Sequence, residues 1–558
     1  MAKESLSLSK VLLNKKLMGL LLKSRTRKII LGLKNDNIFL SEIDKNPDKD
    51  VFVCSDKKVT YSDFKERINR LNNGLLSLGL EKGDHISILS GNSNLILELI
   101  LGPSRSGIIA TPINWHLNKD EIEYVVSNSK SKVLIVEEEF LNNIIPIKSK
   151  LKEVKKIIVI GDKVPEKMIS YEKFLSESSA KINKTIPGQG FMLYTSGTTG
   201  RPKGAHSLAF DDPAIIGATD IADFVLMMNN IVNGCDYRQT TNRHLVVSPL
   251  YHGGPLAFAS ASLYHGGTIF IMRKFDPEKT LQIIEKEKIS TTFMPPIILK
   301  RLMDFPDKNK YDVSSLKVVT CAAAPCPAAL KKRVIDYFGP VFYELYGSTE
   351  AGYNFVLRPE HYIKDSDKIA SVGKIVPANY AKIVDENDNE SPCGTRGDLY
   401  LSNAMVKYLE YYRDPDKTKG SFVDFSGKRY FREGEVAYVD DDGFYYVVDR
   451  KKDMIISGGA NIYPAEIEEA IYSHPSVSDV AVIGVPDEEW GESVKAVIVL
   501  RKNETATSEE IIKYCSKHLA RYKRPKSVDF VNELPRRPDG KLVKRLLRDK
   551  YHSADAFN

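Results

Sequence analysis

Cysteine is scarce in this sequence, and none of it has the spacing of a metal-binding or redox motif. The six cysteines are scattered over the chain, without a Cys-x-x-Cys pair or a Cys/His ligand pattern. This absence excludes a structural zinc site and a disulfide framework. It predicts reduced thiols and therefore a cytoplasmic protein.

No apolar run is long enough to cross a lipid bilayer. In residues 10–33 leucines recur at helical spacing, but Lys15, Lys16 and Lys23 interrupt them. No small-residue cleavage site follows, so a signal peptide is not predicted either. A basic amphipathic helix of this kind could make peripheral contact with an anionic membrane surface, or it could dock on its own domain, and the sequence leaves both open.

Nucleic-acid-binding motifs are also missing, although both ends of the chain are basic. Residues 1–34 hold nine Lys or Arg against one Glu, and residues 521–550 hold eleven against four Asp or Glu. Such basic segments can mark nucleic-acid binding. No helix-turn-helix, RNP or zinc-finger pattern accompanies them, so we expect no nucleic-acid partner, and positive potential also suits anionic substrates.

What the sequence does contain is a long alternation of short apolar runs and helical patterns. Its 558 residues predict two or more domains. From Val59 onward the alternation is typical of βαβ units and a parallel sheet. The first helix is expected at 62–79, and the strands at 86–89, 108–113, 133–136, 157–160, 244–247, 268–271, 291–293, 316–320 and 342–345.

After about Gly394 the composition changes to glycines, aspartates and alternating apolar residues. This change predicts a β-rich subdomain with strands at 397–401, 434–439 and 443–448, and the Asp-Asp-Gly sequence at 441–443 predicts a hairpin turn. The charged run at 449–453 then marks a domain boundary before a last α/β segment.

Residues 191–204, FMLYTSGTTGRPKG, form the segment around which the rest of the chain is organised. The run from Met192 to Tyr194 predicts the end of a buried strand, and the glycines that follow let the backbone approach a ligand closely. Hydroxyl side chains add donors, and Lys203 can offer a cation to phosphate oxygens. Because the spacing differs from GxxxxGK[ST], the segment predicts a phosphate-binding loop of another kind.

This loop resembles the signature loop of the adenylate-forming (ANL) superfamily, which contains acyl-CoA synthetases, luciferases and the adenylation domains of peptide synthetases. Three further motifs follow in that family's order: YGSTE at 346–350, SGGANIYP at 457–464 and RRPDGK at 536–541. The resemblance implies an α/β fold, with a large N-terminal domain of parallel α/β subdomains plus a β-rich subdomain. A small mobile α+β C-terminal domain follows.

The domain boundaries expected from this resemblance lie in the charged run. We expect an N-terminal adenylation domain at 1–449, with 1–34 as a basic amphipathic leader, and a mobile C-terminal lid domain at 450–558. By resemblance Lys452 is the hinge residue, about which the C-terminal domain turns between two half-reactions.

The resemblance also implies a site for ATP with Mg²⁺. Glu350 is the expected metal ligand, because a hard carboxylate oxygen suits Mg²⁺ held between protein and phosphates, and Thr195 shares the metal. The catalytic residues implied are Lys541, Lys203 and Glu350, with the lysines stabilising charge around the attacked α-phosphate. The expected ATP- and AMP-binding residues are Thr195, Ser196, Gly197, Thr198, Thr199, Gly200, Ala323, Ala324, Pro325, Tyr346, Gly347, Ser348, Thr349, Glu435 and Arg450.

Two positions depart from the pattern of that family. Ala323 replaces the first glycine of a triplet that similar enzymes stack against adenine. Glu433-Gly434-Glu435 stands where the family has Thr-Gly-Asp, whose aspartate binds the ribose hydroxyls. Glutamate keeps the acceptor oxygens but reaches one methylene further, so we expect nucleotide binding to change by about 1 kcal/mol.

The acid and the thiol have candidate sites of their own. The acyl-binding residues implied are His252, Gly253 and Gly254, and the CoA-binding residues implied are Ser457, Gly458 and Gly459. The histidine is expected to position the carboxylate, and a role as general base is not assigned to it. Apolar residues at 253–258 and 294–298 predict a hydrophobic acid, either a medium- or long-chain fatty acid or a cyclic or aromatic one.

The predicted function is that of an ATP-dependent acyl-CoA ligase, which forms acyl-AMP and pyrophosphate and then transfers the acyl group to CoA. A stand-alone acyl-AMP ligase and a non-catalytic acyl- or nucleotide-binding relative stay open as alternatives. An amino-acid substrate is not favoured, because residues 252–258 hold no aspartate for an ammonium group. The sequence leaves homodimer formation open.

Overall fold

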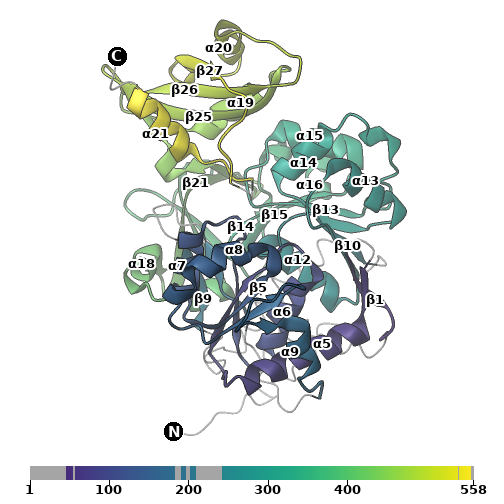
Figure 1. The fold of residues 1–558 in the computed structure, drawn as a ribbon. Coiled ribbons are helices and arrows are strands. Elements are labelled where there is room, and N and C mark those ends of the chain that lie inside the picture. Colours follow the sequence, from purple (N-terminus) through teal and green to yellow (C-terminus); the bar gives the residue numbers. More distant parts are fainter. Residues whose placement is uncertain are drawn as a thin grey trace, which may run out of the picture.

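The computed structural model describes residues 46–54, 57–181, 190–195, 202–208, 242–537 and 540–554 (Figure 1). The basic leader and its segment 10–33, and the loop residues Ser196, Gly197, Thr198, Thr199 and Gly200, lie outside the described residues. No described helix is long and apolar enough to span a membrane.

The first α/β unit is built on a parallel five-stranded sheet in the order β4-β3-β5-β6-β7. Its strands are buried on both faces, as expected where helices cover a parallel sheet. The strands are β3 (His85–Leu89), β4 (Ile109–Pro112), β5 (Ser131–Glu137), β6 (Lys156–Ile160) and β7 (Ile169–Ser170). The helices are α5 (Tyr61–Ser77), α6 (Asn94–Ser104), α7 (Lys119–Asn128), α8 (Leu141–Ile144) and α9 (Tyr171–Ser176).

The second unit contains a nine-stranded sheet in the order β16-β15-β14-β13-β12-β10-β11-β1-β2, parallel in its centre and antiparallel at both edges. Its strands are β1 (Asp50–Cys54), β2 (Lys57–Thr60), β10 (Arg243–Val246), β11 (Thr268–Ile271), β12 (Thr291–Phe293), β13 (Val318–Cys321), β14 (Phe342–Ser348), β15 (Gly352–Leu357) and β16 (Lys374–Ile375). Its helices are α12 (Gly253–Tyr264), α13 (Pro277–Lys286), α14 (Pro296–Met303), α15 (Ala328–Phe338) and α16 (Pro359–Lys364). Because β12, β13 and β14 are parallel, their carboxyl ends meet at one edge, where ligands bind in such sheets.

Two smaller sheets complete the N-terminal domain. The first joins β8 (Leu193–Thr195), β9 (Lys203–Ser207) and β19 (Leu409–Tyr411). The β-rich unit contains β17 (Tyr380–Val384), β18 (Gly397–Ser402), β20 (Phe422–Phe425), β21 (Lys428–Val439) and β22 (Tyr445–Arg450), with α17 (Ala404–Tyr408) and α18 (Pro415–Ser421). The hairpin predicted at 441–443 joins β21 to β22.

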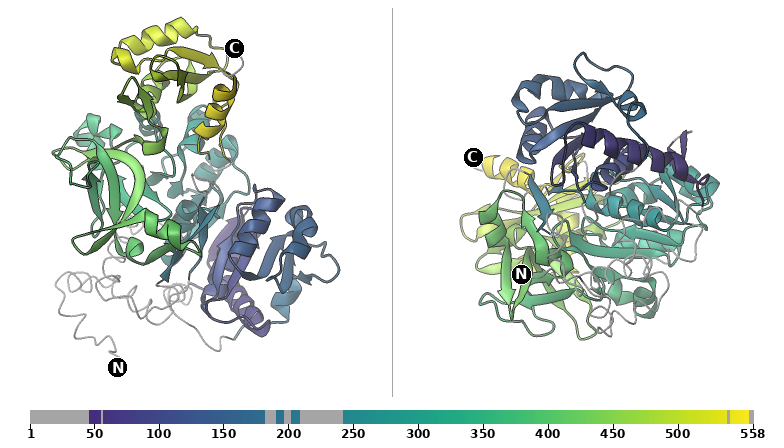
Figure 2. Two further views of the ribbon diagram at one scale, coloured as in Figure 1. Left: turned by 90° about the vertical axis from the view of Figure 1, so that its left-hand side faces the viewer. Right: turned by 90° about the horizontal axis from the view of Figure 1, so that it is seen from below.

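The C-terminal domain is an α+β unit that rests on α14 and α15 of the N-terminal domain (Figure 1). It contains β23 (Ile455–Ser457), β24 (Ala460–Ile462), α19 (Pro464–Tyr472), β25 (Val477–Asp487), β26 (Gly491–Leu500), α20 (Ser508–Ser516), β27 (Ser527–Phe530) and α21 (Lys544–Ala554). Figure 2 shows the purple-to-blue α/β unit and the green β-rich unit on opposite sides below it. The expected fold class is therefore confirmed.

The expected strands of both α/β units are confirmed, with ends that differ by at most three residues. The largest difference is at β14, which was expected to end at residue 345 and extends to Ser348. The extension exists because Gly347 and Ser348 pair with Tyr353 and Gly352 of β15. A Cβ atom at Gly347 would overlap the carbonyl oxygen of Gly352, so the strands can approach this closely only with glycine there.

Candidate active site

The phosphate loop is the connection of the β8–β9 hairpin, in which Thr195 pairs with Lys203. The hairpin places the hydroxyl predicted to share the metal opposite the lysine predicted to bind phosphate. The next strand of the same sheet, β19, adds Tyr411, and Lys203 Nζ lies 5.4 Å from the centre of its ring. Two predicted residues on either side of the loop are thus held by one small sheet.

Tyr411 connects this sheet to the YGSTE motif. Its hydroxyl donates to Glu350 Oε1 at 2.9 Å. Burial lowers the pKa of Lys203, and nearby Lys417 lowers it further, while Asp414 and Glu350 raise it. Lys203 is thus surrounded by one further lysine and two carboxylates, one of which, Glu350, is bound by the Tyr411 hydroxyl. Such a mixture of charges suits a site that receives a phosphate together with its metal ion.

The residues present fit a Mg²⁺ ion that is shared with a nucleotide. Glu350 offers a carboxylate at the end of β14, but among the described residues no three His, Cys, Asp or Glu side chains form a cage of their own. Protein Mg²⁺ sites of this kind use one or two carboxylates and complete the shell with phosphates and water. Glu350 as metal ligand stays a prediction that this donor set supports.

A second contact group joins β14 to β21 and β22. The Tyr346 hydroxyl donates to Glu435 Oε2 at 2.5 Å, and the Ser348 hydroxyl donates to Glu433 Oε2 at 3.1 Å. Arg450 pairs with Glu435 across the strands, with its Nε 3.6 Å from Oε1. The structure therefore brings Tyr346, Ser348, Glu435 and Arg450 together as the sequence predicted for one nucleotide site.

Glu433 is a residue of this site to which the sequence assigned no role. Burial raises its pKa well above the ordinary value, and the charges of Glu435 and Glu350 raise it further. Burial also raises the pKa of Glu435, opposed by the hydrogen bond from Tyr346 and the charge of Arg450. The sequence signal for Glu433 was a glutamate at the position where the family has threonine. Only the fold shows that its carboxyl group lies close enough to Glu435 and Glu350 to interact with their charges.

Glu433→Gln is expected to stabilise the protein at pH 8 and to have a smaller effect at pH 5. A carboxyl group whose pKa is raised by folding is favoured in its protonated form, so its destabilising charge appears as pH rises above the unfolded value. Glutamine mimics the protonated form and removes that charge. The measurement is the thermal unfolding temperature at both pH values, with Glu386→Gln as an exposed control; a gain that is no larger at pH 8 than at pH 5 would contradict the prediction.

The alanine-rich segment follows β13 at the carboxyl edge of the sheet. Because β13 pairs with β14, the residues Ala323, Ala324 and Pro325 leave the sheet beside the strand that carries Tyr346. Ala323 has a φ of 77°, in the left-handed region that favours glycine. An alanine in this conformation carries some strain, about 1 kcal/mol.

The predicted acyl-binding motif lies against the same hairpin and sheet edge. His252 is the residue before α12, and Gly253 would place a Cβ 3.1 Å from Leu193 of β8. A Cβ at Gly254 would lie 2.7 Å from Phe293 and 3.1 Å from the Tyr353 hydroxyl. This packing puts α12 between the phosphate hairpin and an aromatic wall.

Three of the lysines near the C-terminus, Lys526, Lys541 and Lys544, have different surroundings. Lys544 is half-buried and bound to Glu468 at 2.8 Å, and Lys526 is bound to Asp487 at 3.1 Å. Lys541 lies in the loop before α21, and a Cβ at the preceding Gly540 would overlap Ile297 at the start of α14. Since α14 follows β12, this loop is docked near the carboxyl edge of the nine-stranded sheet.

The predicted CoA-binding residues lie on a separate hairpin. Gly458 and Gly459 have positive φ values of 57° and 78° and form the two-residue turn between β23 and β24. Gly458 donates its backbone N–H to Trp490, and Ser457 pairs with Gly491. In the described part of the chain these contacts remain inside the C-terminal domain, so the structure does not bring the hairpin to the nucleotide residues.

The predicted hinge is a short 3₁₀ helix, Lys451–Asp453, between the two domains. Lys451 binds Asp398 of the N-terminal domain at 2.7 Å, and Asp453 accepts from Arg548 of α21 at 2.9 Å. Burial lowers the pKa of Lys452, and Arg450, Arg548 and Arg537 lower it further, opposed by Asp453. The predicted hinge residue, Lys452, therefore lies between Lys451, which is bound to the N-terminal domain, and Asp453, which is bound to the C-terminal domain.

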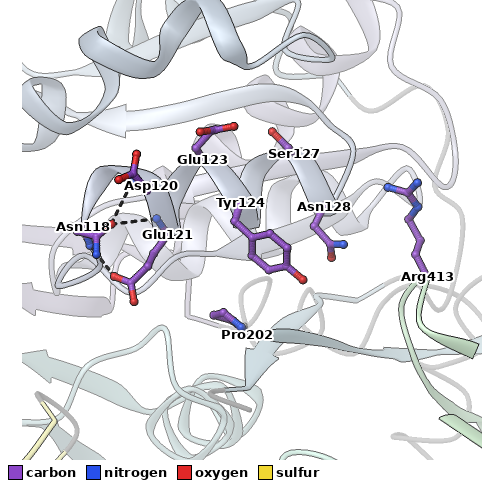
Figure 3. Close-up of a pocket in the computed structure, with 9 residues that line it drawn as sticks. All are labelled: Asn118, Asp120, Glu121, Glu123, Tyr124, Ser127, Asn128, Pro202 and Arg413. Carbon is purple, nitrogen blue, oxygen red and sulfur yellow. Dashed lines mark hydrogen bonds between the residues drawn. The ribbon is translucent and has the colours of Figure 1, made fainter. Parts of the chain in front are cut away.

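A surface pocket of about 670 Å³ lies between α7 and Pro202 (Figure 3). Its walls carry carboxylates at Asp120, Glu121 and Glu123, with Arg413 at one side. Anionic walls do not suit a phosphate group, and the nucleotide residues placed above do not line this pocket.

Comparison with known proteins places the chain in a family. The family described as AMP-binding enzyme matches residues 39–409, and the AMP-binding enzyme C-terminal domain matches 466–541. The chain is 31% identical over 503 residues to a feruloyl-CoA synthase of Amycolatopsis sp, covering 88% of this chain and 94% of that protein. It is 31% identical over 511 residues to the long-chain-fatty-acid–CoA ligase FadD13 of Mycobacterium tuberculosis, covering 89% and 94%. The crystal structure of ATP-bound MatB from Rhodopseudomonas palustris matches with a TM-score of 0.79 at 27% identity, covering 93% of this chain and 99% of MatB.

The chain belongs to the family of AMP-binding enzymes, within the adenylate-forming superfamily. Its enzyme class is that of AMP-forming acid–thiol ligases, and this class implies ATP, CoA and a carboxylic acid as substrates. The recognition made from the sequence motifs is confirmed. The individual site residues stay predictions, which the contacts above support.

Proposed function

We propose that this protein is an ATP-dependent ligase that converts a hydrophobic carboxylic acid to its CoA thioester through an acyl-adenylate. The observation that carries the proposal is two sets of contacts that meet in the YGSTE motif. One runs from Lys203 through Tyr411 to Glu350. The other runs from Tyr346 to Glu435 and Arg450. Together they join cations for phosphates to acceptors for ribose at one edge of the sheet.

In the first step, a carboxylate oxygen of the acid forms a bond to the α-phosphorus of ATP, and the bond from phosphorus to pyrophosphate breaks. Lys203 and Lys541 balance the charge that develops on the phosphates, and Mg²⁺ bound at Glu350 would neutralise part of it. Glu435 accepts from the ribose hydroxyls, and Arg450 orients that carboxylate. Positioning and electrostatics supply the rate enhancement.

In the second step, the C-terminal domain turns about Lys452 and presents the hairpin of Ser457, Gly458 and Gly459 to the acyl-adenylate. The CoA sulfur forms a bond to the acyl carbon, and the bond from that carbon to AMP breaks. Two adjacent glycines leave room for the extended thiol arm of CoA to pass close to the backbone.

The aromatic side chains that Phe258 of α12 packs against support a hydrophobic acid. Phe258 and Phe293 have ring centres 5.4 Å apart, and Tyr353 lies 6.0 Å from Phe258. Phe258 and Phe293 are buried, and Met294 beside them is fully buried. The surroundings of the predicted acyl-binding motif are therefore apolar and aromatic. Such surroundings suit apolar or aromatic groups, in agreement with the feruloyl-CoA and long-chain-fatty-acid–CoA ligases among the similar proteins.

The test is pyrophosphate release with ATP and Mg²⁺ across fatty, aryl and cyclic carboxylates, with and without CoA. We expect sustained release only with CoA and only with hydrophobic acids. Sustained release without CoA would instead support the acyl-AMP ligase, and no release with any acid, while ATP still binds in calorimetry, would support a non-catalytic relative.

A further inference from the structure

Two glutamates of α19 contact the N-terminal domain: Glu466 lies 3.7 Å from Arg396, and Glu469 binds the backbone of α15. Glu468 binds Lys544 within the C-terminal domain, as expected for a structural ion pair. The neighbouring Glu469 crosses to the N-terminal domain, where its two carboxylate oxygens accept the backbone N–H of Ala328 at 3.0 and 3.3 Å. A single side chain thus links the small domain to the first residue of α15.

The receiving end of α15 has no cap of its own. Its N-cap residue is Pro327, which makes no side-chain hydrogen bond to the first turn. The first amides of a helix need an acceptor, and the positive end of the helix dipole favours a carboxylate there. Glu469 therefore supplies from the other domain what a serine or aspartate usually supplies within the chain.

The same helix end is connected to the nucleotide site. Glu469 also interacts with the charge of Lys331, which lies one turn into α15. Lys331 forms a buried ion pair with Glu344 of β14, and the end of that strand carries Tyr346 and Ser348. The contact made by the C-terminal domain therefore lies on α15, whose Lys331 is paired with the strand that carries the nucleotide residues.

Other contacts between the two domains also stabilise this orientation. Lys300 Nζ donates to Ser478 Oγ at 2.8 Å, and Arg501 lies 3.6 Å from Asp304. The loop before α21 packs on Ile297. Asp449 beside the predicted hinge also accepts from the backbone N–H of Ala465 in the first turn of α19, at 2.8 Å. Of the contacts named here that lie away from the hinge, that of Glu469 places a carboxylate on a helix N-terminus.

We propose that Glu469 is a positioning residue that holds the C-terminal domain in the orientation in which the Lys541 loop is docked. Its catalytic consequence rests on the proposed function: this orientation serves acyl-adenylate formation, and turning about Lys452 withdraws the carboxylate from α15. Loss of the contact then favours the orientation for transfer to CoA.

The direct test is the distance between the domains. Spin labels at Ile363→Cys and Tyr522→Cys, both exposed positions, report it without any substrate. The background replaces by serine the cysteines that are not shown to be buried, Cys54, Cys235 and Cys393. Glu469→Gln is expected to raise the ratio of other orientations to this one by about 3- to 10-fold, the factor for one charge-assisted bond at a helix N-terminus. The matched control is Glu510→Gln, which removes a glutamate from the cap of α20 inside the C-terminal domain.

Ala328→Pro tests the same hydrogen bond from the other domain. It removes the donor N–H at the first helical position, where proline is tolerated, and is expected to shift the distances in the same direction. Distances unchanged in both Glu469→Gln and Ala328→Pro, or equally changed in Glu510→Gln, would overturn the proposal. This result does not depend on turnover, so it is distinguishable from failure of the proposed ligase function.

The half-reactions give the second readout. Glu469→Gln is expected to slow acyl-adenylate formation about 3- to 10-fold and to leave CoA-dependent consumption of a preformed acyl-adenylate unchanged or faster. Equal slowing of both half-reactions would indicate a merely structural role and would overturn the assignment.

Discussion

Replacing Lys541 by alanine is expected to slow acyl-adenylate formation by about 10²- to 10³-fold, the usual cost of removing one charge-stabilising group from a transition state. Lys541 follows Gly540, whose close contact with Ile297 docks this loop at the carboxyl edge of the nine-stranded sheet. In the proposed mechanism, the lysine no longer serves the reaction once the C-terminal domain has turned. Transfer from preformed acyl-adenylate to CoA should therefore change by no more than about threefold.

The measurement separates the two half-reactions. Acyl-adenylate formation is followed as pyrophosphate exchange into ATP, and transfer is followed with synthetic acyl-adenylate and CoA. Lys526→Ala is the matched control, because this lysine lies in the same domain but is bound to Asp487. The assignment fails if Lys541→Ala slows both half-reactions equally, or if Lys526→Ala slows adenylate formation as much.

The strands of the two α/β units could be predicted because each is a short run of β-branched and other apolar residues that becomes fully buried. Residues 268–271 and 291–293 were predicted with the ends that the structure shows. The end of β14 was missed, because its last residues are polar and glycine. Pairing with β15, and not local apolar character, keeps them in the strand.

The motif residues of the nucleotide site could be predicted because each motif is local in the sequence. Tyr411 could not, since it lies 61 residues from Glu350 and belongs to no motif. Ala323 was recognised as a replacement for glycine, but its positive φ is a property of the folded loop. Glu469 was missed for a similar reason: its partner is a backbone amide, which leaves no trace in residue types.

The buried ion pair at the base of the site was also absent from the sequence prediction, and it carries the largest expected effect on stability. Lys331 is 2% exposed and Glu344 is 4% exposed, and their charged groups are in contact. Lys331 also donates to the carbonyl oxygens of Ile369 and Ser371 at 2.8 and 3.1 Å. Burial opposes the charge of Lys331, but Glu344 raises the pKa of Lys331 above its ordinary value. Burial also raises the pKa of Glu344, opposed by the charge of Lys331 and its hydrogen bond.

Lys331→Met is expected to lower the free energy of unfolding of the N-terminal domain by about 3–5 kcal/mol, because it leaves the Glu344 carboxylate buried without its partner. Urea unfolding in a Trp490→Phe background measures this, since Trp115 then remains as the one tryptophan of the chain and reports the N-terminal domain. The loss is electrostatic and not a packing defect, since methionine has nearly the length of lysine.

Two further variants test that reason. Lys331→Met with Glu344→Leu is expected to recover most of the lost stability, because no unpaired charge remains in the interior. Lys288→Met is the matched control: it removes a lysine from an exposed pair with Asp312 and should cost less than about 1 kcal/mol. A double variant as unstable as Lys331→Met alone would show that the hydrogen bonds to Ile369 and Ser371, and not the ion pair, hold the base of β14.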